Sequence, residues 1–154
     1  MAIQIYAPHS YEDLRGIPKV FLAGSIDNGQ AEDWQTWLFE QLTDIKVVLL
    51  NPRRPDWDSQ LECDRNNPQF REQVEWELNG LHAADFIAMY FAPNSKAPIS
   101  LLEMGLFAQS KKMIVCCPKG YWRKGNVDIV CERYHIKQVE TIEELLKEIQ
   151  LIAG

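Results

Sequence analysis

Short apolar runs alternate with longer segments of helical periodicity along most of the chain. The apolar runs predict buried strands at residues 19–24, 46–52, 85–93 and 112–118 and a shorter strand at 136–140. The intervening segments place apolar side chains three and four residues apart, which predicts helices near residues 30–43, 68–83 and 99–110 and a last helix from Thr141. Residues 52–66 form a long polar loop, and residues 119–135 show a mixed pattern without a predicted element.

Strands that alternate with helices imply crossover connections, and therefore a parallel sheet covered on both faces. We expect an α/β fold, a flavodoxin-like doubly wound sheet of about five parallel strands with helices on both faces. The 154 residues are enough for one domain with a sizeable core. Because no repeat, low-complexity segment or linker divides them, residues 1–154 are expected to form a single domain.

The ends of the predicted strands are the first place to look for a site, because doubly wound sheets bind ligands beyond the carboxyl ends of their strands. These ends carry Gly24, Ser25, Asp27, Asn51, Arg53, Arg54, Asn94, Ser95, Pro118 and Lys119. The candidates for substrate binding among them are Gly24, Ser25, Asp27, Asn51, Asn94 and Ser95. Arg53 and Arg54 could bind an anion, but pairing with Asp56 and Asp58 is favoured. The turn GSIDNG resembles an anion cradle at a helix start, although its aspartate would repel a phosphate.

Glu103 stands near the start of the helix that follows the third predicted strand. Ser100 and Glu103 have the Ser-x-x-Glu spacing of a capping box, in which both side chains bond free amides of the first turn. The same helix start faces the expected ligand crevice. A helix dipole stabilises a nearby carboxylate, so it would keep Glu103 ionised, as a nucleophile must be. The position permits both a cap and a catalytic role.

Glu77 is a second carboxylate that the pattern directs towards this crevice. Its helix has an apolar stripe of Phe70, Val74, Leu78 and Leu81, and Glu77 falls at the edge of that stripe. Charged side chains rarely lie there without a partner. Glu77 could extend to the rim of the protein, or it could face the crevice. Two carboxylates that flank one site are the arrangement that glycosidic chemistry uses.

The positions of two further residues relative to the predicted strands indicate their roles. Trp57 lies in the loop NPRRPDWD above the presumed site, where it could stack on a nucleobase or pin the loop to the surface. Asp85 stands at the start of the third predicted strand, which is the wrong end for the site, so we expect it to be structural.

The composition narrows the class of protein. A net charge of -6 argues against wide contact with nucleic acid or an anionic membrane. The four cysteines include no CxxC and no cluster with metal-ligand spacing, so we expect reduced thiols and no metal. The amino terminus does not resemble a signal peptide, and no apolar run approaches the ~20 residues of a membrane span. A cytoplasmic location is expected.

Four segments, in order over about residues 19–136, resemble the nucleoside 2-deoxyribosyltransferase family and the related deoxynucleoside monophosphate N-glycosidases. They are FLAGSI, ELNGLHAAD, LLEMG and RKGNVDIV. The segments NPRRPDWD and PISLLEMG look like a bacterial branch of that family. Three departures stand out: Phe21 replaces a frequent tyrosine, Glu77 replaces the usual aspartate, and PNSKAPIS lacks the Asp and Gly that commonly precede the glutamate.

The resemblance implies roles for individual residues. Glu103 matches the catalytic nucleophile and Glu77 the acidic residue of the family's active site. Phe21 falls in the first-strand segment of the site. Asn126, with Asp128, lies in a segment that reaches a neighbouring subunit's pocket, which implies a homo-oligomer with shared sites. On the residue evidence and the resemblance together, we interpret Glu103 as a nucleophile.

The reaction implied is a transfer of 2-deoxyribose between nucleobases in nucleoside salvage, with a 2′-deoxynucleoside and a free base as substrates. Glu103 would form a covalent intermediate, with retention at C1′, and no cofactor would be needed. An N-glycosidase that hydrolyses deoxynucleosides or their 5′-monophosphates is the alternative. A non-catalytic nucleotide-binding module is a second alternative, from a different class of protein.

Overall fold

The computed structural model describes the backbone of residues 1–154 and every side chain except that of Asn28. The strands are β1 (Ile3–Tyr6), β2 (Lys19–Gly24), β3 (Val48–Asn51), β4 (Phe86–Tyr90), β5 (Met113–Cys116) and β6 (Lys137–Val139). The helices are the 3-10 turn η1 (Asp27–Gly29), α1 (Trp34–Gln41), α2 (Pro68–Ala83), α3 (Pro98–Phe107), α4 (Lys124–Tyr134) and α5 (Ile142–Ala153). In this described chain, no helix is long and apolar enough to cross a bilayer.

The strands form one parallel sheet in the order β1-β3-β2-β4-β5-β6. The five predicted strands are β2 to β6, and their order corresponds to the flavodoxin-like 2-1-3-4-5, so the predicted fold class is confirmed. Strand β1 was not predicted. It adds to the edge beside β3, with Ile3 opposite Val48, and its four residues are only partly buried.

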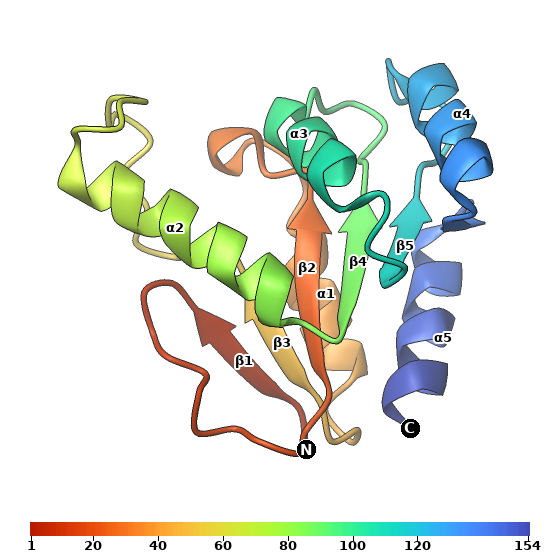
Figure 1. The fold of residues 1–154 in the computed structure, drawn as a ribbon, viewed down its shortest axis with the longest axis horizontal. Helices are drawn as coiled ribbons and strands as arrows, with labels where there is room; N and C mark the ends of the chain where they lie inside the picture. The colour runs from red at the N-terminus through yellow and green to blue at the C-terminus, as the bar shows by residue number, and fades with distance from the viewer.

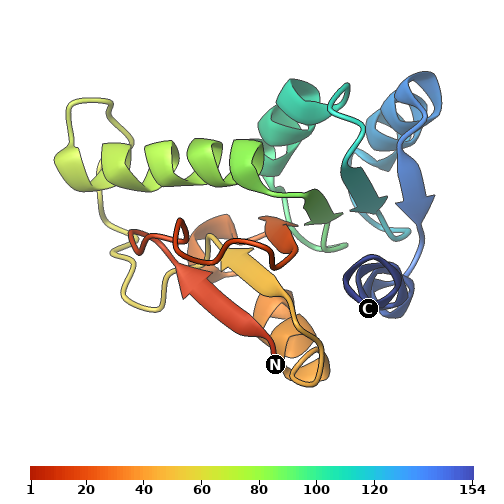
Figure 2. The same ribbon diagram turned by 60° about the horizontal axis from the view of Figure 1, so that its bottom comes forward.

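The helices divide between the two faces of the sheet (Figure 1). Figure 2 shows α2, α3 and α4 on one side and α1 and α5 on the other. The first layer buries Trp76 and Leu81 of α2 and Phe107 of α3 against the sheet. The second buries Leu38 of α1 and Leu145 of α5. Because both faces are covered, the central strands are almost continuously apolar, as the short runs in the sequence indicated.

Most predicted helices form at the predicted places. Helix α2 has the predicted bounds, and Asn67 caps it by accepting a hydrogen bond from the Phe70 amide (3.1 Å). Helix α5 follows Thr141, whose hydroxyl accepts from the Glu144 amide (3.2 Å). Helix α1 is shorter than predicted, because residues 27–33 form the 3-10 turn and a connection instead.

Helix α4 was missed, and it occupies the segment with a mixed pattern. Only Val127 and Cys131 of this helix are buried, one turn apart, so its apolar stripe is too narrow to show as a helical period.

Candidate active site

A cavity of about 600 Å³ lies beyond the carboxyl end of β2, between α2, α3 and the loop of residues 52–66. Its walls are mainly apolar, with two carboxylates, Glu77 and Glu103, among the lining side chains. Gly24 forms part of its floor. A Cβ on Gly24 would lie 2.2 Å from the Tyr90 carbonyl oxygen, and its φ of +149° is rare for other residues, so β2 and β4 meet this closely only with glycine here.

Glu103 enters the cavity from α3 and is 7% exposed. Burial raises its pKa from an ordinary 4.5 to about 7. The expectation that the helix dipole keeps this carboxylate ionised is therefore wrong below neutral pH, because the loss of hydration outweighs the dipole. At and above pH 7, Glu103 becomes available as an anion.

Glu77 enters the same cavity from α2 and is partly exposed. Its pKa is raised well above 4.5, first by burial of the carboxyl and then by the charge of Glu103, whereas a contact with the Gln73 side chain lowers it. Because the charge of an ionised Glu103 disfavours a second anion, Glu77 is the member of the pair that keeps its proton. The two carboxylates thus share one site, and the charge of an ionised Glu103 favours the protonated form of Glu77.

The start of α3 is built differently from the predicted capping box. The helix begins at Pro98, after Ala97 in the left-handed region (φ 46°), and no side chain of α3 caps it. Ser100 is in the first turn and Glu103 in the second, so the capping-box prediction is wrong. The carboxylate of Asp27 instead accepts hydrogen bonds from the amides of Lys96 (2.8 Å) and Ala97 (2.9 Å). Asp27 therefore fixes the chain that leads into α3.

Trp57 lines the cavity, as the sequence suggested, from the loop between β3 and α2. The guanidinium of Arg54 lies 5.8 Å from the centre of the Trp57 ring. It also pairs with Asp56 (3.2 Å) and Glu72 (3.6 Å). The prediction that Arg54 pairs with an aspartate is confirmed. Arg53 differs, because its guanidinium donates mainly to backbone carbonyls of residues 29–32 and holds that turn.

Both predicted substrate-binding serines are engaged inside the protein. The hydroxyls of Ser25 and Ser95 lie 2.5 Å apart, and both are buried. Ser25 Oγ also accepts from the Ala92 amide (2.9 Å), and Ser95 Oγ donates to the Ala92 carbonyl (2.8 Å). This network ties the ends of β2 and β4 together.

Two other predicted residues are also committed to the interior. The Asn51 side chain donates to Gln4 (2.7 Å) and accepts from the Arg53 amide (2.9 Å). Phe21 is fully buried beneath α2, with its ring centre 6.1 Å from that of Trp76. Gly80 permits this contact, because a Cβ there would lie 2.9 Å from the Phe21 ring.

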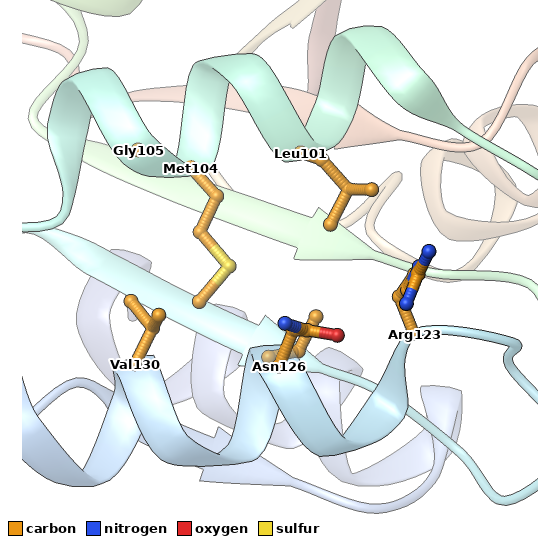
Figure 3. Close-up of a pocket in the computed structure, with 7 residues that line it drawn as sticks. Leu101, Met104, Gly105, Arg123, Asn126 and Val130 are labelled. Carbon is orange, nitrogen blue, oxygen red and sulfur yellow. The ribbon is translucent and has the colours of Figure 1, made fainter.

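The remaining predicted residues lie away from the carboxylates of their own chain. Asn94 is exposed. Asn126 lines a separate cavity of about 310 Å³ between α3 and α4, where it faces Leu101 and Met104 (Figure 3). Asp128 pairs with Lys124 (3.1 Å) on α4. The resemblance implies that Asn126 and Asp128 reach the pocket of a neighbouring subunit, and this stays a prediction.

Asp85 behaves as expected of a structural residue. Its carboxylate accepts from the Lys19 amide (2.8 Å) at the amino-terminal end of β2.

Several cavity residues were predicted to be core or were not singled out. Phe70, Val74 and Leu78 belong to the apolar stripe of α2, but they are partly exposed and line the cavity, whereas Trp76 and Leu81 pack on the sheet. Helical periodicity cannot distinguish a core face from a cavity wall. Gln73 was not noticed, although its spacing of four residues from Glu77 places both on one face of α2.

The fold and the site together define a class of protein: a doubly wound α/β protein with a mostly apolar cavity that holds two carboxylates of raised pKa. Residues 17–121 match the family model described as nucleoside 2-deoxyribosyltransferase like. This chain belongs to that family.

Comparison with solved structures supports the fold. A conserved protein from Enterococcus faecalis V583 superposes with a TM-score of 0.60 at 14% identity, over 88% of this chain and 98% of that chain. At this identity the likeness concerns the fold alone. A search of curated proteins gave no match.

Proposed function

We propose that this protein transfers 2-deoxyribose from a 2′-deoxynucleoside to a free nucleobase by double displacement. The observation that carries the proposal is the pair of carboxylates, Glu77 and Glu103, in one mostly apolar cavity beyond the strand ends. A retaining glycosyl transfer needs an anionic nucleophile and a group that holds a proton, and unequal pKa values provide both at one pH.

The first half-reaction forms a glycosyl ester. An ionised carboxylate oxygen of Glu103 attacks C1′, the bond from C1′ to the base nitrogen breaks, and the base departs with the bonding electrons. Glu77 donates its proton to the departing base, which leaves neutral. The sugar lacks a 2′-hydroxyl, whose electron withdrawal would destabilise the oxocarbenium-like transition state.

The second half-reaction reverses these steps with a different base. A nitrogen of the incoming base attacks C1′ and the ester bond to Glu103 breaks. The incoming base transfers its surplus proton to the Glu77 carboxylate. Two inversions at C1′ give overall retention, and the enzyme returns to its starting protonation state.

The shape of the cavity suits a nucleoside. Its mainly apolar walls and Trp57 offer a surface on which a planar base can stack. The hydroxyls of Ser25 and Ser95, which could otherwise donate to a phosphate at the strand ends, are bonded within the protein. This favours a nucleoside over a 5′-monophosphate as the substrate.

Hydrolysis is the second candidate function, because the cavity carboxylates would also serve an N-glycosidase in which water replaces the second base. A non-catalytic nucleotide-binding module is the third. We also propose that sites are shared between subunits of a homo-oligomer, since Asn126 lies outside the carboxylate cavity of its own chain.

The deciding experiment incubates the protein with deoxyinosine, with and without adenine, and separates the products by chromatography. Deoxyadenosine that forms only with adenine supports transfer. Hypoxanthine and free deoxyribose without adenine indicate hydrolysis. Binding without either product, at an affinity that Glu103→Gln does not change, indicates a binding module.

A further inference from the structure

Ser100 is a buried polar side chain, in the wall of the cavity that holds the two carboxylates, that the reaction scheme does not use. It stands in the first turn of α3, three residues before Glu103, and is 3% exposed. Residues three apart share one face of a helix, with about 5–6 Å between their Cβ atoms. Because both residues line the cavity, Ser100 and Glu103 border the same part of it.

The Ser100 hydroxyl lacks the backbone partner that a serine in a helix can use. Such a hydroxyl can donate to the carbonyl four residues earlier, which here belongs to Lys96. That carbonyl already accepts hydrogen bonds from the Tyr121 hydroxyl (2.7 Å) and from Trp122 Nε1 (3.0 Å), so both of its lone pairs are used. Ser100 does not cap its own helix either, because no side chain caps α3.

This hydroxyl is open to the cavity. Within the described residues no protein group bonds to it, and the unpartnered side-chain atoms that are sealed from solvent belong to Gln35, Arg54 and Gln73. The Ser100 hydroxyl is not one of these sealed atoms, and the residue lines the cavity. Since buried polar groups are rarely left without a partner, we expect a ligand in the cavity to supply one.

The charges around Ser100 decide what kind of group it can bind. The Asp27 carboxylate holds the amides of Lys96 and Ala97 just before the helix, and Glu103 follows Ser100 by one turn. A phosphate or carboxylate between these two acidic side chains would be repelled once Glu103 is ionised, as the reaction needs. A neutral hydroxyl avoids this repulsion, and serine can donate a hydrogen bond to it or accept one from it. Ser100 therefore suits a hydroxyl of the sugar.

The direction of attack selects one of the two sugar hydroxyls. In a 2′-deoxynucleoside the base and the 5′-carbon lie on one face of the ring, and the 3′-hydroxyl lies on the other. Glu103 attacks C1′ from the face opposite the base, which is the face of the 3′-hydroxyl. We propose that the Ser100 hydroxyl binds the 3′-hydroxyl of 2′-deoxyribose and selects substrates that carry it. The inference rests on the proposed function, because the attack by Glu103 determines which face of the sugar meets α3.

The test compares nucleosides that differ by one hydroxyl. Calorimetry gives the affinities of 2′-deoxyinosine, 2′,3′-dideoxyinosine and 2′,5′-dideoxyinosine for Glu103→Gln, in which no glycosyl ester can form. Loss of the 3′-hydroxyl should weaken binding about five- to tenfold, the effect of one hydrogen bond, and a further Ser100→Ala change should remove most of this penalty. The penalty for losing the 5′-hydroxyl should be the same in both proteins. The matched control is Ser59→Ala, at another serine of the cavity wall, which should leave both penalties unchanged.

A 3′-hydroxyl penalty that Ser100→Ala leaves unchanged would overturn the inference, and so would a change confined to the 5′-hydroxyl. If Ser100→Ala does not fold, Ser100→Cys replaces the hydroxyl by a weak donor and gives the same comparison. Because the measurement is binding, its failure is distinct from failure of the proposed function. A Ser100-dependent penalty in a protein that transfers no deoxyribose would refute the transferase and keep the sugar contact. Transfer with an unchanged penalty would do the reverse, and no binding of deoxyinosine would refute both.

Discussion

Glu103 and Glu77 belong to a residue type that is ionised at neutral pH on most protein surfaces. In the cavity, loss of hydration raises the pKa of both carboxyls, and neighbouring side chains shift that of Glu77 further. Glu103 reaches a pKa of about 7, whereas Glu77 is raised by burial and by the Glu103 charge together. At this scale the chemistry depends on what surrounds each carboxyl more than on its identity.

Replacement of Glu103 by glutamine should abolish turnover and leave the fold intact. The amide has the size of the carboxyl but cannot attack C1′, so we expect kcat to fall on the order of 10³-fold or more. Thermal unfolding and a transfer assay are the measurements. A folded Glu103→Gln protein with near wild-type transfer would refute the role of Glu103 as the nucleophile.

Replacement of Glu77 by glutamine should lower kcat by about 10²–10⁴-fold and change KM little, because the proton donor is lost while the cavity shape is kept. The activity of the wild type should rise with pH as Glu103 ionises near pH 7 and fall when Glu77 loses its proton. The falling limb should be absent in Glu77→Gln. Glu75→Gln, an exposed residue of α2, is the control. An unchanged pH–rate profile with full activity would make Glu77 a rim residue.

The raised pKa of Glu103 also predicts a pH dependence of stability. Between pH 4.5 and 7 the folded protein binds a proton at Glu103 that the unfolded chain has released, so the free energy of unfolding falls as pH rises through this window. The shift from 4.5 to about 7 corresponds to a loss of about 3 kcal/mol. Urea unfolding at several pH values is the measurement. The loss of unfolding free energy across this window should be smaller in Glu103→Gln than in the wild type by about this amount. Equal slopes of unfolding free energy against pH in both proteins would contradict the raised pKa of Glu103.

At the scale of elements, the site depends on how α3 starts. The amides of Lys96 and Ala97 precede the helix, and their acceptor is a carboxylate from the turn after β2. The Ser25–Ser95 hydroxyl pair ties the same two segments together. Glu103, one turn into α3, is thus placed by contacts with the adjacent strand's turn as well as by its own helix.

Asp27→Ala should therefore weaken the fold and the reaction together. Two backbone amides lose their acceptor, which should lower the free energy of unfolding by about 1–3 kcal/mol, and kcat should fall because Glu103 is less well placed. Asp33→Ala is a matched control, since it removes the cap of α1 (Thr36 amide, 3.2 Å) away from the carboxylates. If both variants retain wild-type kcat, the start of α3 does not position the nucleophile.

At the scale of the whole molecule, apolar side chains remain exposed on α3 and α4. Ile99, Leu102 and Leu106 of α3 are 58–60% exposed, and Ile129 of α4 is 68% exposed. The first three line the carboxylate cavity, while Asn126 stands on α4 beside a different one. A homo-oligomer with shared sites would cover such surfaces and bring Asn126 to a neighbour's carboxylates.

Shared sites can be tested by mixing two inactive variants, Glu103→Ala and Asn126→Ala. In a mixed dimer one site would carry both changes and the other neither, so random exchange should restore about a quarter of the wild-type activity. Activity of the wild type should also fall on dilution below the subunit dissociation constant. No recovery after verified subunit exchange would exclude the shared-site model.

Much of the fold could be predicted from the sequence, because apolar periodicity and strand length are local properties. Strands β2 to β6 and helices α2 and α5 follow from such patterns. The short, partly buried β1 and the narrow stripe of α4 carry too little local signal, and only pairing with β3 and packing on the sheet select them. Their contribution to the free energy of folding comes from partners distant in the chain.

For the site, the sequence by itself determined the edge of the sheet and the two carboxylates, since strand ends and helix faces can be counted along the chain. Only the tertiary structure decided which strand-end side chains are free. Ser25, Ser95 and Asn51 are bonded internally, Asp27 holds α3, and Phe70 lines a cavity where core was expected. Hydrogen-bond partners and hydration depend on elements far apart in sequence, so the pKa values arise only when α2, α3 and the loop over the cavity come together.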